Sequence, residues 1–432
     1  MMSNVIIWLY QLGWSPAALQ KWVSPDGTEY VLSNLNFPTH LIVFAIVDSL
    51  NDIKLKKASR HRNGKGMENG VDFASLFQLK NSKFFKKDYQ MLSAFETAVA
   101  GALWPNERVH EAFPEVSPLC SRCELEIETD FHTIWDCPCN DNIDSDFVRK
   151  SNRYKGLASA GVDTEPCLWL RGILPLHHTV ISKEDIVTRR IFYTKGDPPP
   201  MGSWPSGAYY GDGSGGKYGK IPAARRCGCS VVCLNENNVL DYGLYYSLPG
   251  EIQTVPRAEL SSIVTLLEVV EEEAVVVYFG DNKPVIDLYY KGQDICAKAA
   301  NADLYKLLFA LIKNKKLIIH MFWMPSHLDD PNACNSKGEP KERPEWVQDH
   351  DIVGNKEADK LADRAAEIAE LPEWVVLPVI DAQKMAKHIQ LRIATIICNL
   401  PKRKHVSKQW HDFAPPKINP LTQAEADTEH NS

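Results

Sequence analysis

The chain has 432 residues, 44% of them hydrophobic and 24% charged, which is typical of folded globular proteins and excludes a mainly disordered or membrane-embedded chain. This length allows two or three domains. The 48 Lys and Arg and 55 Asp and Glu residues give a net charge of -7, so any surface for a polyanion must be local. The longest apolar run near the start, residues 5–12, is too short to span a bilayer. We therefore expect an intracellular protein, nuclear or cytoplasmic, with no membrane partner.

Residues 1–115 form an N-terminal region without a recognisable motif, which we expect to be mainly helical. Its basic patch at 54–65 could contact phosphates, although a run of charges is more often a solvated loop. Further along, a connector over 151–206 leads into the Pro-rich sequence GDPPPMGSWPSG at 196–207. Three consecutive prolines cannot join a helix or a central strand. The sequence therefore predicts a hinge between independently folding domains.

Cysteine and histidine residues cluster between the N-terminal region and the connector. Cys120 and Cys123 are separated by two residues, and His132 and Cys137 follow. These spacings are compatible with one structural, tetrahedral Zn²⁺. Cys139 competes with Cys137 as the fourth ligand, and unrelated cysteines near a histidine are the alternative. The 11 cysteines of the chain are irregularly spaced, which argues against a disulfide framework.

Strand-like and helix-like patterns alternate after the hinge. Strands are expected at 207–213, 226–234, 239–248, 274–279 and 316–323, and helices from 254 and at 282–290, 301–313 and 353–370. The order βββαβαβα implies an α/β domain with a mixed five-stranded sheet flanked by helices. A further helix at 381–399 precedes a basic run at 402–408 and a polar tail, which we expect to be disordered.

Four carboxylates stand at the ends of these elements. Asp212 closes the first strand, Glu259 lies one turn into a helix, Asp281 follows the fourth strand, and Asp359 lies in the last helix. Each has an ordinary structural explanation, as a turn residue, a first-turn acid, an N-cap or a solvated helical residue. Their joint order along the chain is the more informative feature.

The motifs DGSGG, RAEL, FGDN and NKEADKLA, with MPSHL before the last helix, resemble the type I ribonuclease H family. The resemblance implies a ribonuclease H-like fold and identifies Asp212, Glu259, Asp281 and Asp359 as catalytic acids. It also implies that His327 assists product release. The expected activity is that of an endonuclease that hydrolyses the RNA strand of RNA/DNA hybrids.

Closely placed carboxylates repel one another, and divalent cations relieve the repulsion. Oxygen ligands suit Mg²⁺ or Mn²⁺, and two ions about 4 Å apart can activate water and stabilise a departing oxygen. The resemblance implies that Asp212 bridges both ions, that Glu259 and Asp281 bind one, and that Asp359 binds the other.

Polar residues beside the acids are candidate substrate contacts. Gln253, Thr254 and Asn282 are adjacent to catalytic acids or their helices, and the resemblance adds Asn355. Thr254 could be only a helix cap, and Asn282 only a turn residue. The chain has no long basic protrusion between Asp281 and the last strand. It has instead an insert at 329–351, rich in Pro, Gly and charge, for which we expect a flexible flap that gates the site or recruits substrate.

The segment around the Cys and His residues resembles the zinc-binding segment that follows the reverse transcriptase in non-LTR retrotransposon polyproteins. The chain as a whole therefore resembles the carboxyl-terminal part of such a polyprotein, with a reverse transcriptase as a further candidate partner. The alternative is a catalytically silent fragment that binds nucleic acid. The oligomeric state is not predicted. The expected regions are 1–115 (N-terminal region), 116–150 (zinc-binding module), 151–206 (connector and hinge), 207–370 (ribonuclease H-like domain) and 371–432 (helix and tail).

Overall fold

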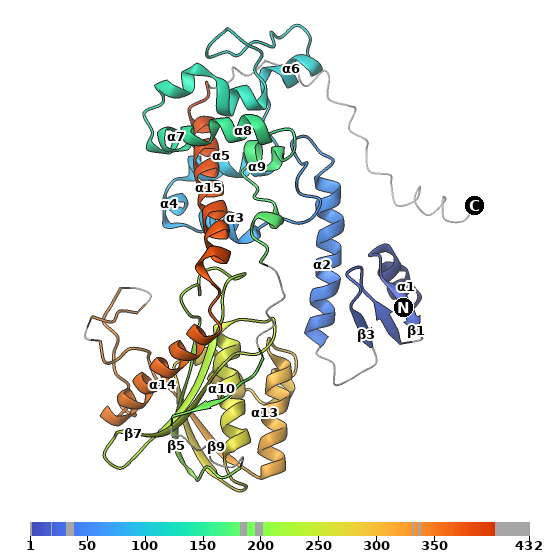
Figure 1. Ribbon diagram of the computed structural model, residues 1–432. Coiled ribbons are helices and arrows are strands. Elements are labelled where there is room, and N and C mark those ends of the chain that lie inside the picture. Colours follow the sequence, from blue (N-terminus) through green and yellow to red (C-terminus); the bar gives the residue numbers. More distant parts are fainter. Residues whose placement is uncertain are drawn as a thin grey trace, which may run out of the picture. The chain divides into compact units, whose positions relative to one another are not determined.

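The chain folds into two compact units, which consist of residues 1–79 with 163–387 and of residues 80–162 with 388–432 (Figure 1). The computed structural model describes residues 2–18, 20–31, 39–181, 188–194, 202–330, 332–335 and 338–401. The three consecutive prolines of the expected hinge, the basic run at 402–408 and the polar tail lie outside the described residues. None of the described helices combines the length and the apolarity that crossing a bilayer would require.

A mixed β-sheet organises the larger unit, and the expected α/β class is confirmed. The strand order is β4-β7-β6-β5-β8-β9, in which β8 and β9 run parallel to β5 and the other pairs are antiparallel. The strands are β4 (Phe192–Tyr193), β5 (Gly207–Ser214), β6 (Gly228–Leu234), β7 (Leu240–Ser247), β8 (Val275–Gly280) and β9 (Ile318–Trp323).

The sheet has six strands, not the five that the sequence indicated. The additional strand, β4, comes from the connector, where Phe192 pairs with Tyr245 and Tyr193 with Leu244 of β7. An uncovered β7 would present a row of unpaired backbone groups, and this short paired segment covers part of that row. The connector is therefore partly built into the sheet.

Helices cover both faces of the sheet, because successive side chains of a strand point to opposite sides. Tyr209 packs in the core with α10 (Val255–Val269) and α13 (Ala302–Lys315), while its neighbour Tyr210 packs on the other face against Ala358. Ala358 belongs to α14 (Asp349–Ile368). The short helices α11 (Lys283–Tyr289) and α12 (Gln293–Cys296) connect β8 to α13.

The N-terminal segment of the larger unit contains a small antiparallel sheet besides its helices. Strands β1 (Ser15–Ala18), β2 (Lys21–Val23) and β3 (Glu29–Val31) lie between α1 (Met2–Gln11) and α2 (Thr39–Ala58). Leu9, Trp14, Trp22 and Tyr30 form its core. The basic patch begins in the last turn of α2, where Lys56 and Lys57 lie and where positive charge is favourable to the helix dipole. Helix α3 (Phe73–Lys80) follows.

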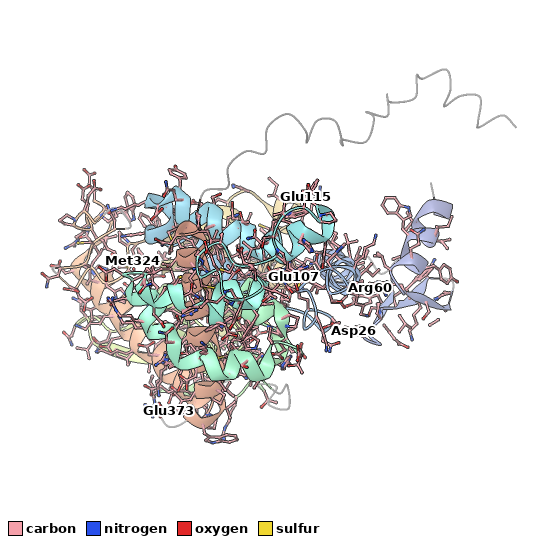
Figure 2. The ribbon with its side chains drawn as sticks, turned by 90° about the horizontal axis from the view of Figure 1, so that it is seen from above. Asp26, Arg60, Glu107, Glu115, Met324 and Glu373 are labelled. Atoms are coloured by element: carbon pink, nitrogen blue, oxygen red, sulfur yellow. The ribbon has the colours of Figure 1, made fainter. Side chains whose placement is uncertain are left out.

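Short helices build the smaller unit, and part of the last helix belongs to it. These are α4 (Lys83–Lys87), α5 (Tyr89–Val99), α6 (Asn106–Ala112), α7 (Asp146–Ser151) and α8 (Lys155–Gly161). Helix α15 (Glu373–Cys398) begins in the larger unit at Glu373, which Figure 2 labels together with Glu107 of α6. Within the smaller unit, the buried guanidinium of Arg392 donates to the carbonyl oxygens of Ile134 and Val148, which ties the end of α15 to this unit.

Candidate functional site

Parallel pairing of β5 and β8 brings Asp212 and Asp281 to the same edge of the sheet. Tyr210 is the register partner of Phe279, and each acid lies two residues further along its strand direction. The carboxyl ends of neighbouring parallel strands meet at one edge, which is where α/β proteins commonly place their sites. The two carboxylates therefore lie side by side through backbone register alone.

Helix α10 adds Glu259 because β5 has a glycine at the point of closest approach. A Cβ on Gly213 would lie 2.7 Å from the backbone nitrogen of Glu259, so no larger residue allows this packing. The Ser262 hydroxyl, one turn further, donates to the backbone oxygen of Asp212 over 3.0 Å. As a result, carboxylate oxygens of Asp212, Glu259 and Asp281 lie within 4.8 Å of one another.

Helix α14 brings Asp359 to the site by packing closely on the opposite face of β5 and β6. A Cβ on Gly228 would overlap the carbonyl oxygen of Ala362, and the Ser230 hydroxyl donates to the carbonyl oxygen of Ala358 over 2.6 Å. The helix begins at Asp349, four residues before the expected start at 353, because Gln348 and Asp351 form a capping box. The end of the insert is therefore helical.

His327 lies beside the fourth acid. Its Nδ1 is 4.0 Å from Oδ2 of Asp359, and its side chain is 59% exposed. The residue has a φ of 52°, a left-handed conformation that is uncommon for non-glycine residues. An exposed imidazole on such a turn can move toward the acids or away from them.

Burial raises the pKa values of the four carboxyls, and repulsion by neighbouring acids adds to it for Asp212, Glu259 and Asp359. Burial is the largest cause for each group. The charges of Asp281 and Asp359 add to it for Asp212, whose pKa lies well above its usual range. The charges of Asp212 and Asp281 likewise raise the pKa of Glu259. A cluster of oxygen ligands under this repulsion fits hard divalent cations, which would relieve it.

The expected substrate contacts differ in what they can offer. Gln253 is 9% exposed; its amide donates to the carbonyl oxygens of Leu248 and Gly250, and its carbonyl oxygen accepts from the backbone N–H of Cys227. Both amide donors are therefore used within the loop. Thr254 occupies the N-cap position of α10 without a capping bond from its side chain.

Asn282 and Asn355 are held in different ways. The Asn282 side chain caps α11 by accepting from the backbone N–H of Val285. Asn355 is 6% exposed, and its Oδ1 has no partner among the described residues. Asn355 is therefore the one of the two that keeps a free acceptor close to Asp359.

Tyr278 is a residue of the site that the sequence did not indicate. It is 1% exposed, and its hydroxyl has no hydrogen-bond partner among the described residues. Burial, followed by the charges of Glu259, Asp212 and Asp281, raises its pKa well above the usual range. The phenol is therefore neutral, and the charges of three of the acids act on it. Strand alternation would have placed it inside the sheet core but would not have indicated this interaction.

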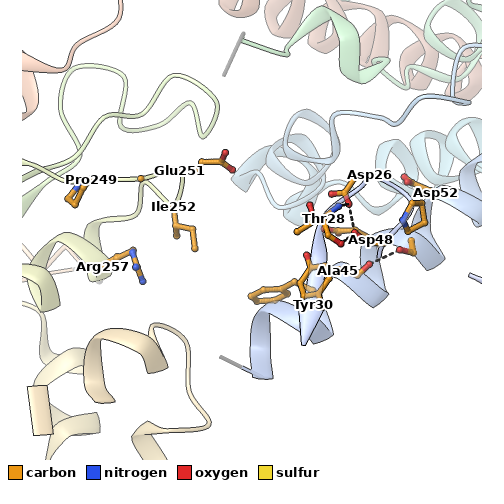
Figure 3. Close-up of a pocket in the computed structure, with 15 residues that line it drawn as sticks. Asp26, Thr28, Tyr30, Ala45, Asp48, Asp52, Pro249, Glu251, Ile252 and Arg257 are labelled. Atoms are coloured by element: carbon orange, nitrogen blue, oxygen red, sulfur yellow. Dashed lines mark hydrogen bonds between the residues drawn. The ribbon is translucent and has the colours of Figure 1, made fainter. Parts of the chain in front are cut away.

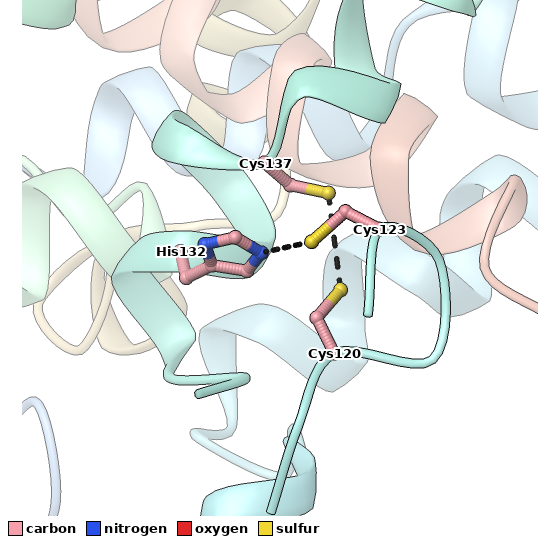
Figure 4. Close-up of side chains that lie close together, drawn as sticks. All are labelled: Cys120, Cys123, His132 and Cys137. Carbon is pink, nitrogen blue, oxygen red and sulfur yellow. Dashed lines mark hydrogen bonds between the residues drawn. The ribbon is translucent and has the colours of Figure 1, made fainter. Parts of the chain in front are cut away.

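The expected zinc ligands also lie together, in the smaller unit (Figure 4). The sulfur of Cys120 is 3.8 Å from that of Cys137, and the sulfur of Cys123 is 3.4 Å from Nε2 of His132. All four ligand atoms lie within 4.8 Å of one another, and Cys139 is outside this group. Three thiols and one imidazole are a donor set that fits a tetrahedral Zn²⁺.

The surroundings of this cluster orient its ligands. Nδ1 of His132 is 3.0 Å from Oε2 of Glu126, an arrangement that fixes the ring and leaves Nε2 for a metal. Backbone N–H groups of Leu125 and Glu126 lower the pKa of the Cys123 thiol to about 7, whereas burial raises the pKa of Cys137 to about 12. Thiolate formation at Cys137 therefore needs a neighbouring positive charge, which a bound metal ion would supply.

A separate hollow of about 570 Å³ lies elsewhere in the larger unit (Figure 3). Asp26, Asp48 and Asp52 line it together with Glu251 and Arg257. The Arg257 guanidinium is engaged with Asp303 over 2.6 Å. Among the described residues that line this hollow, none is one of the four acids, so it is distinct from the acid cluster.

Comparison with solved structures finds similarity to ribonuclease H domains. The N-terminal RNase H domain of a Mycobacterium tuberculosis protein, solved as a fusion with maltose-binding protein, is 16% identical, with a TM-score of 0.24, over 38% of this chain and 95% of that chain. LC9-RNase H1, a type 1 RNase H with the type 2 active-site motif, is 15% identical, with a TM-score of 0.27, over 44% of this chain and 87% of that chain. No protein-family model and no curated protein matches the sequence. Each of these similarities covers less than half of this chain.

Proposed function

We propose that the chain is a metal-dependent endonuclease that hydrolyses the RNA strand of RNA/DNA hybrids, with residues 207–370 as its catalytic domain. One observation carries the proposal: oxygens of Asp212, Glu259 and Asp281 lie within 4.8 Å of one another, and the charge of Asp359 acts on Asp212. Such a group of buried acids is unfavourable without cations, so the fold holds it at a cost in stability. Sites that keep such strain are commonly functional.

The proposed roles follow from the position of each residue. Two Mg²⁺ or Mn²⁺ ions, when bound by the four carboxylates, would activate water and stabilise the charge on the scissile phosphate. The charges of Asp281 and Asp359 both act on Asp212, and in the proposed assignment Asp212 would hold both ions, Glu259 and Asp281 would hold one, and Asp359 would hold the other. His327 is exposed and next to Asp359, which suits a residue that moves as product leaves. Of the candidate substrate contacts, Asn355 has the free acceptor.

We further infer that Cys120, Cys123, His132 and Cys137 bind one structural Zn²⁺, and that 116–150 is a zinc-binding module. The converging donors and the His132–Glu126 contact support this inference. The order of a zinc module before a nuclease domain, together with the resemblance of both segments, supports an origin in a retroelement. A reverse transcriptase is the corresponding candidate partner.

Cleavage of labelled RNA/DNA hybrid, double-stranded DNA and double-stranded RNA in Mg²⁺ tests the proposal. We expect the RNA strand of the hybrid to be cut, and we expect Asp281→Asn and a chelator each to abolish cutting. Cleavage of DNA, or equal activity in Asp281→Asn, would overturn the proposal. A chain that binds the hybrid but does not cut it would be the alternative, a catalytically silent nucleic-acid-binding fragment.

A further inference from the structure

A large hollow opens beside Asp281, and the insert forms one of its walls. Its volume is about 1080 Å³, at the upper end of the roughly 300–1,000 Å³ range of ligand pockets. Trp323, Pro325 and Ser326, at the end of β9 and just beyond it, line one side. Residues 339–346 line the other. We call residues 338–347 the insert limb. The hollow is therefore continuous with the acid cluster through Asp281.

The insert limb is attached to the rest of the domain at several points. Nζ of Lys341 donates to the backbone oxygen and the hydroxyl of Ser326 over 2.8 and 2.9 Å. Arg343 pairs with Asp349, the first residue of α14, over 2.6 Å, and Val347 is 1% exposed. These contacts attach the described part of the insert to the segment just after β9 and to α14; whether the insert acts as a flap stays a prediction.

Trp346 places an exposed aromatic ring on the insert side of the hollow. Its side chain is 53% exposed, yet its indole N–H donates to the backbone oxygen of Trp323 over 3.2 Å. A single exposed hydrophobic residue is ordinary in a folded protein. This one is different because its polar atom is hydrogen-bonded to the end of β9 and because it lines a hollow that reaches a proposed catalytic acid. Stacking of a nucleobase on an aromatic ring contributes about 1–3 kcal/mol.

The charges of the insert limb indicate whether the hollow fits a duplex or a single nucleotide. Lys341 lines the hollow together with Asp281, and its positive charge lowers the pKa of that acid. Glu339, Glu342 and Glu345 also line the hollow, and so does Arg343, whose guanidinium is paired with Asp349. Acids therefore outnumber cations on the limb, which disfavours a row of phosphates. A single nucleotide avoids this repulsion, because it can present one phosphate to Lys341 and its base to Trp346.

Base pairing within a duplex also prevents a base from stacking on Trp346. Both faces of a base inside a helix are covered by its neighbours, whereas unpaired bases can be splayed out and stacked on aromatic side chains. On the basis of the proposed nuclease function, we propose that the hollow binds an unpaired ribonucleotide of the cut strand. The preferred substrate is then a hybrid with a single-stranded RNA extension.

The test compares kcat and KM for a blunt hybrid and for the same hybrid with a single-stranded RNA or DNA extension. We expect the wild-type protein to prefer the RNA extension. Trp346→Ala should raise KM for that substrate by about 5- to 150-fold, the equivalent of about 1–3 kcal/mol, with kcat retained and the blunt hybrid unaffected. Trp346→Phe should keep most of the affinity, because it keeps an aromatic face.

Trp374→Ala is the matched control, since Trp374 is 75% exposed and lies in the first turn of α15. The inference is overturned if Trp346→Ala and Trp374→Ala change KM for the RNA-extended hybrid equally. It is also overturned if Trp346→Ala raises KM equally for blunt and extended hybrids, or if the wild-type protein prefers a DNA extension. Should the wild-type protein cut no hybrid, the nuclease proposal fails separately. Fluorescence anisotropy can then still measure the affinity of the wild-type protein and of Trp346→Ala for the blunt and extended hybrids, and so decide whether Trp346 binds the extension. If Trp346→Ala is unstable, Trp346→Phe provides a folded variant.

Discussion

The acid cluster of the larger unit and the Cys and His cluster of the smaller unit are assembled in opposite ways. The acids come from β5, α10, β8 and α14, which are parts of one sheet and the helices on its two faces. The sulfur and nitrogen ligands all lie between residues 120 and 137, in a stretch with one π-helical turn, His132–Asp136. The acids come together only because the sheet and its helices have folded. Metal binding at the Cys and His cluster, by contrast, would itself stabilise the folded state of its short segment.

Removal of zinc should have the largest effect, and it should be confined to the smaller unit. Structural zinc contributes apparent binding free energies of about 10–16 kcal/mol in small zinc domains. We expect a chelator, or Cys123→Ser, to abolish the protection of the amides of 120–137 from hydrogen exchange while the sheet of the larger unit stays protected. Metal content measured by mass spectrometry should fall in parallel.

Cys139→Ser is the control for this experiment, because Cys139 lies outside the group of four ligands. It should keep its zinc and its protected amides. Loss of zinc from Cys139→Ser with retention in Cys137→Ser would show that the fourth ligand is wrongly assigned, and a protein purified without zinc would contradict the metal site itself.

Glu259→Gln should have the next largest effect, on activity and not on folding. The amide has the shape of a neutral carboxyl, so the 3% exposed site loses a charge that is already unfavourable there. We expect cleavage of the hybrid to fall by about 10⁴-fold, the order of loss seen when the carboxylate of a catalytic group that acts as a unit is removed, with no loss of stability in urea. Glu367→Gln, an exposed position on α14, should retain both activity and stability. A Glu259→Gln variant with wild-type activity would show that Glu259 is not needed for cleavage of the hybrid.

The stability of the metal-free protein should depend on pH through the same acids. Their folded pKa values lie above the ordinary 3.8 of Asp212 and 4.5 of Glu259, so the folded state binds more protons than the unfolded state and stability falls as pH rises through that window. Stability of Glu259→Gln relative to the wild-type protein should therefore increase with pH above 4.5. Mg²⁺ at ten times its Kd should raise the free energy of unfolding of the wild-type protein by about 1.4 kcal/mol, and it should not do so for Glu259→Gln. A difference that stays flat with pH would contradict the raised pKa of Glu259.

The order of the main strands and helices over 207–370 was accessible from the sequence, because hydrophobic periodicity reports local structure, whereas strands β1 to β3 of the N-terminal segment were not predicted. Each acid alone was only a turn, cap or helical residue, and the ordered motifs were what indicated a site. The sequence could not indicate the pairing of Phe192 with β7, the effect of the acids on Tyr278 or the hydrogen bond of Trp346 to Trp323. These features depend on contacts between segments far apart in the chain, for which a single sequence carries no periodic pattern.

Two glycine substitutions give the smallest expected effects and test whether packing on the sheet positions Asp359. Gly228→Ala would place a methyl group against the carbonyl oxygen of Ala362 in α14, and overpacking of this kind costs about 1–3 kcal/mol. Because α14 must shift to relieve the contact, activity should fall together with the urea midpoint. Gly156→Ala, in α8 of the smaller unit, meets nothing within 4 Å and should stabilise that helix by about 0.4–1 kcal/mol. If Gly228→Ala unfolds at a lower urea concentration but cuts the hybrid at the wild-type rate, α14 would tolerate displacement without moving Asp359, and the fold would hold the fourth acid less tightly than the other three.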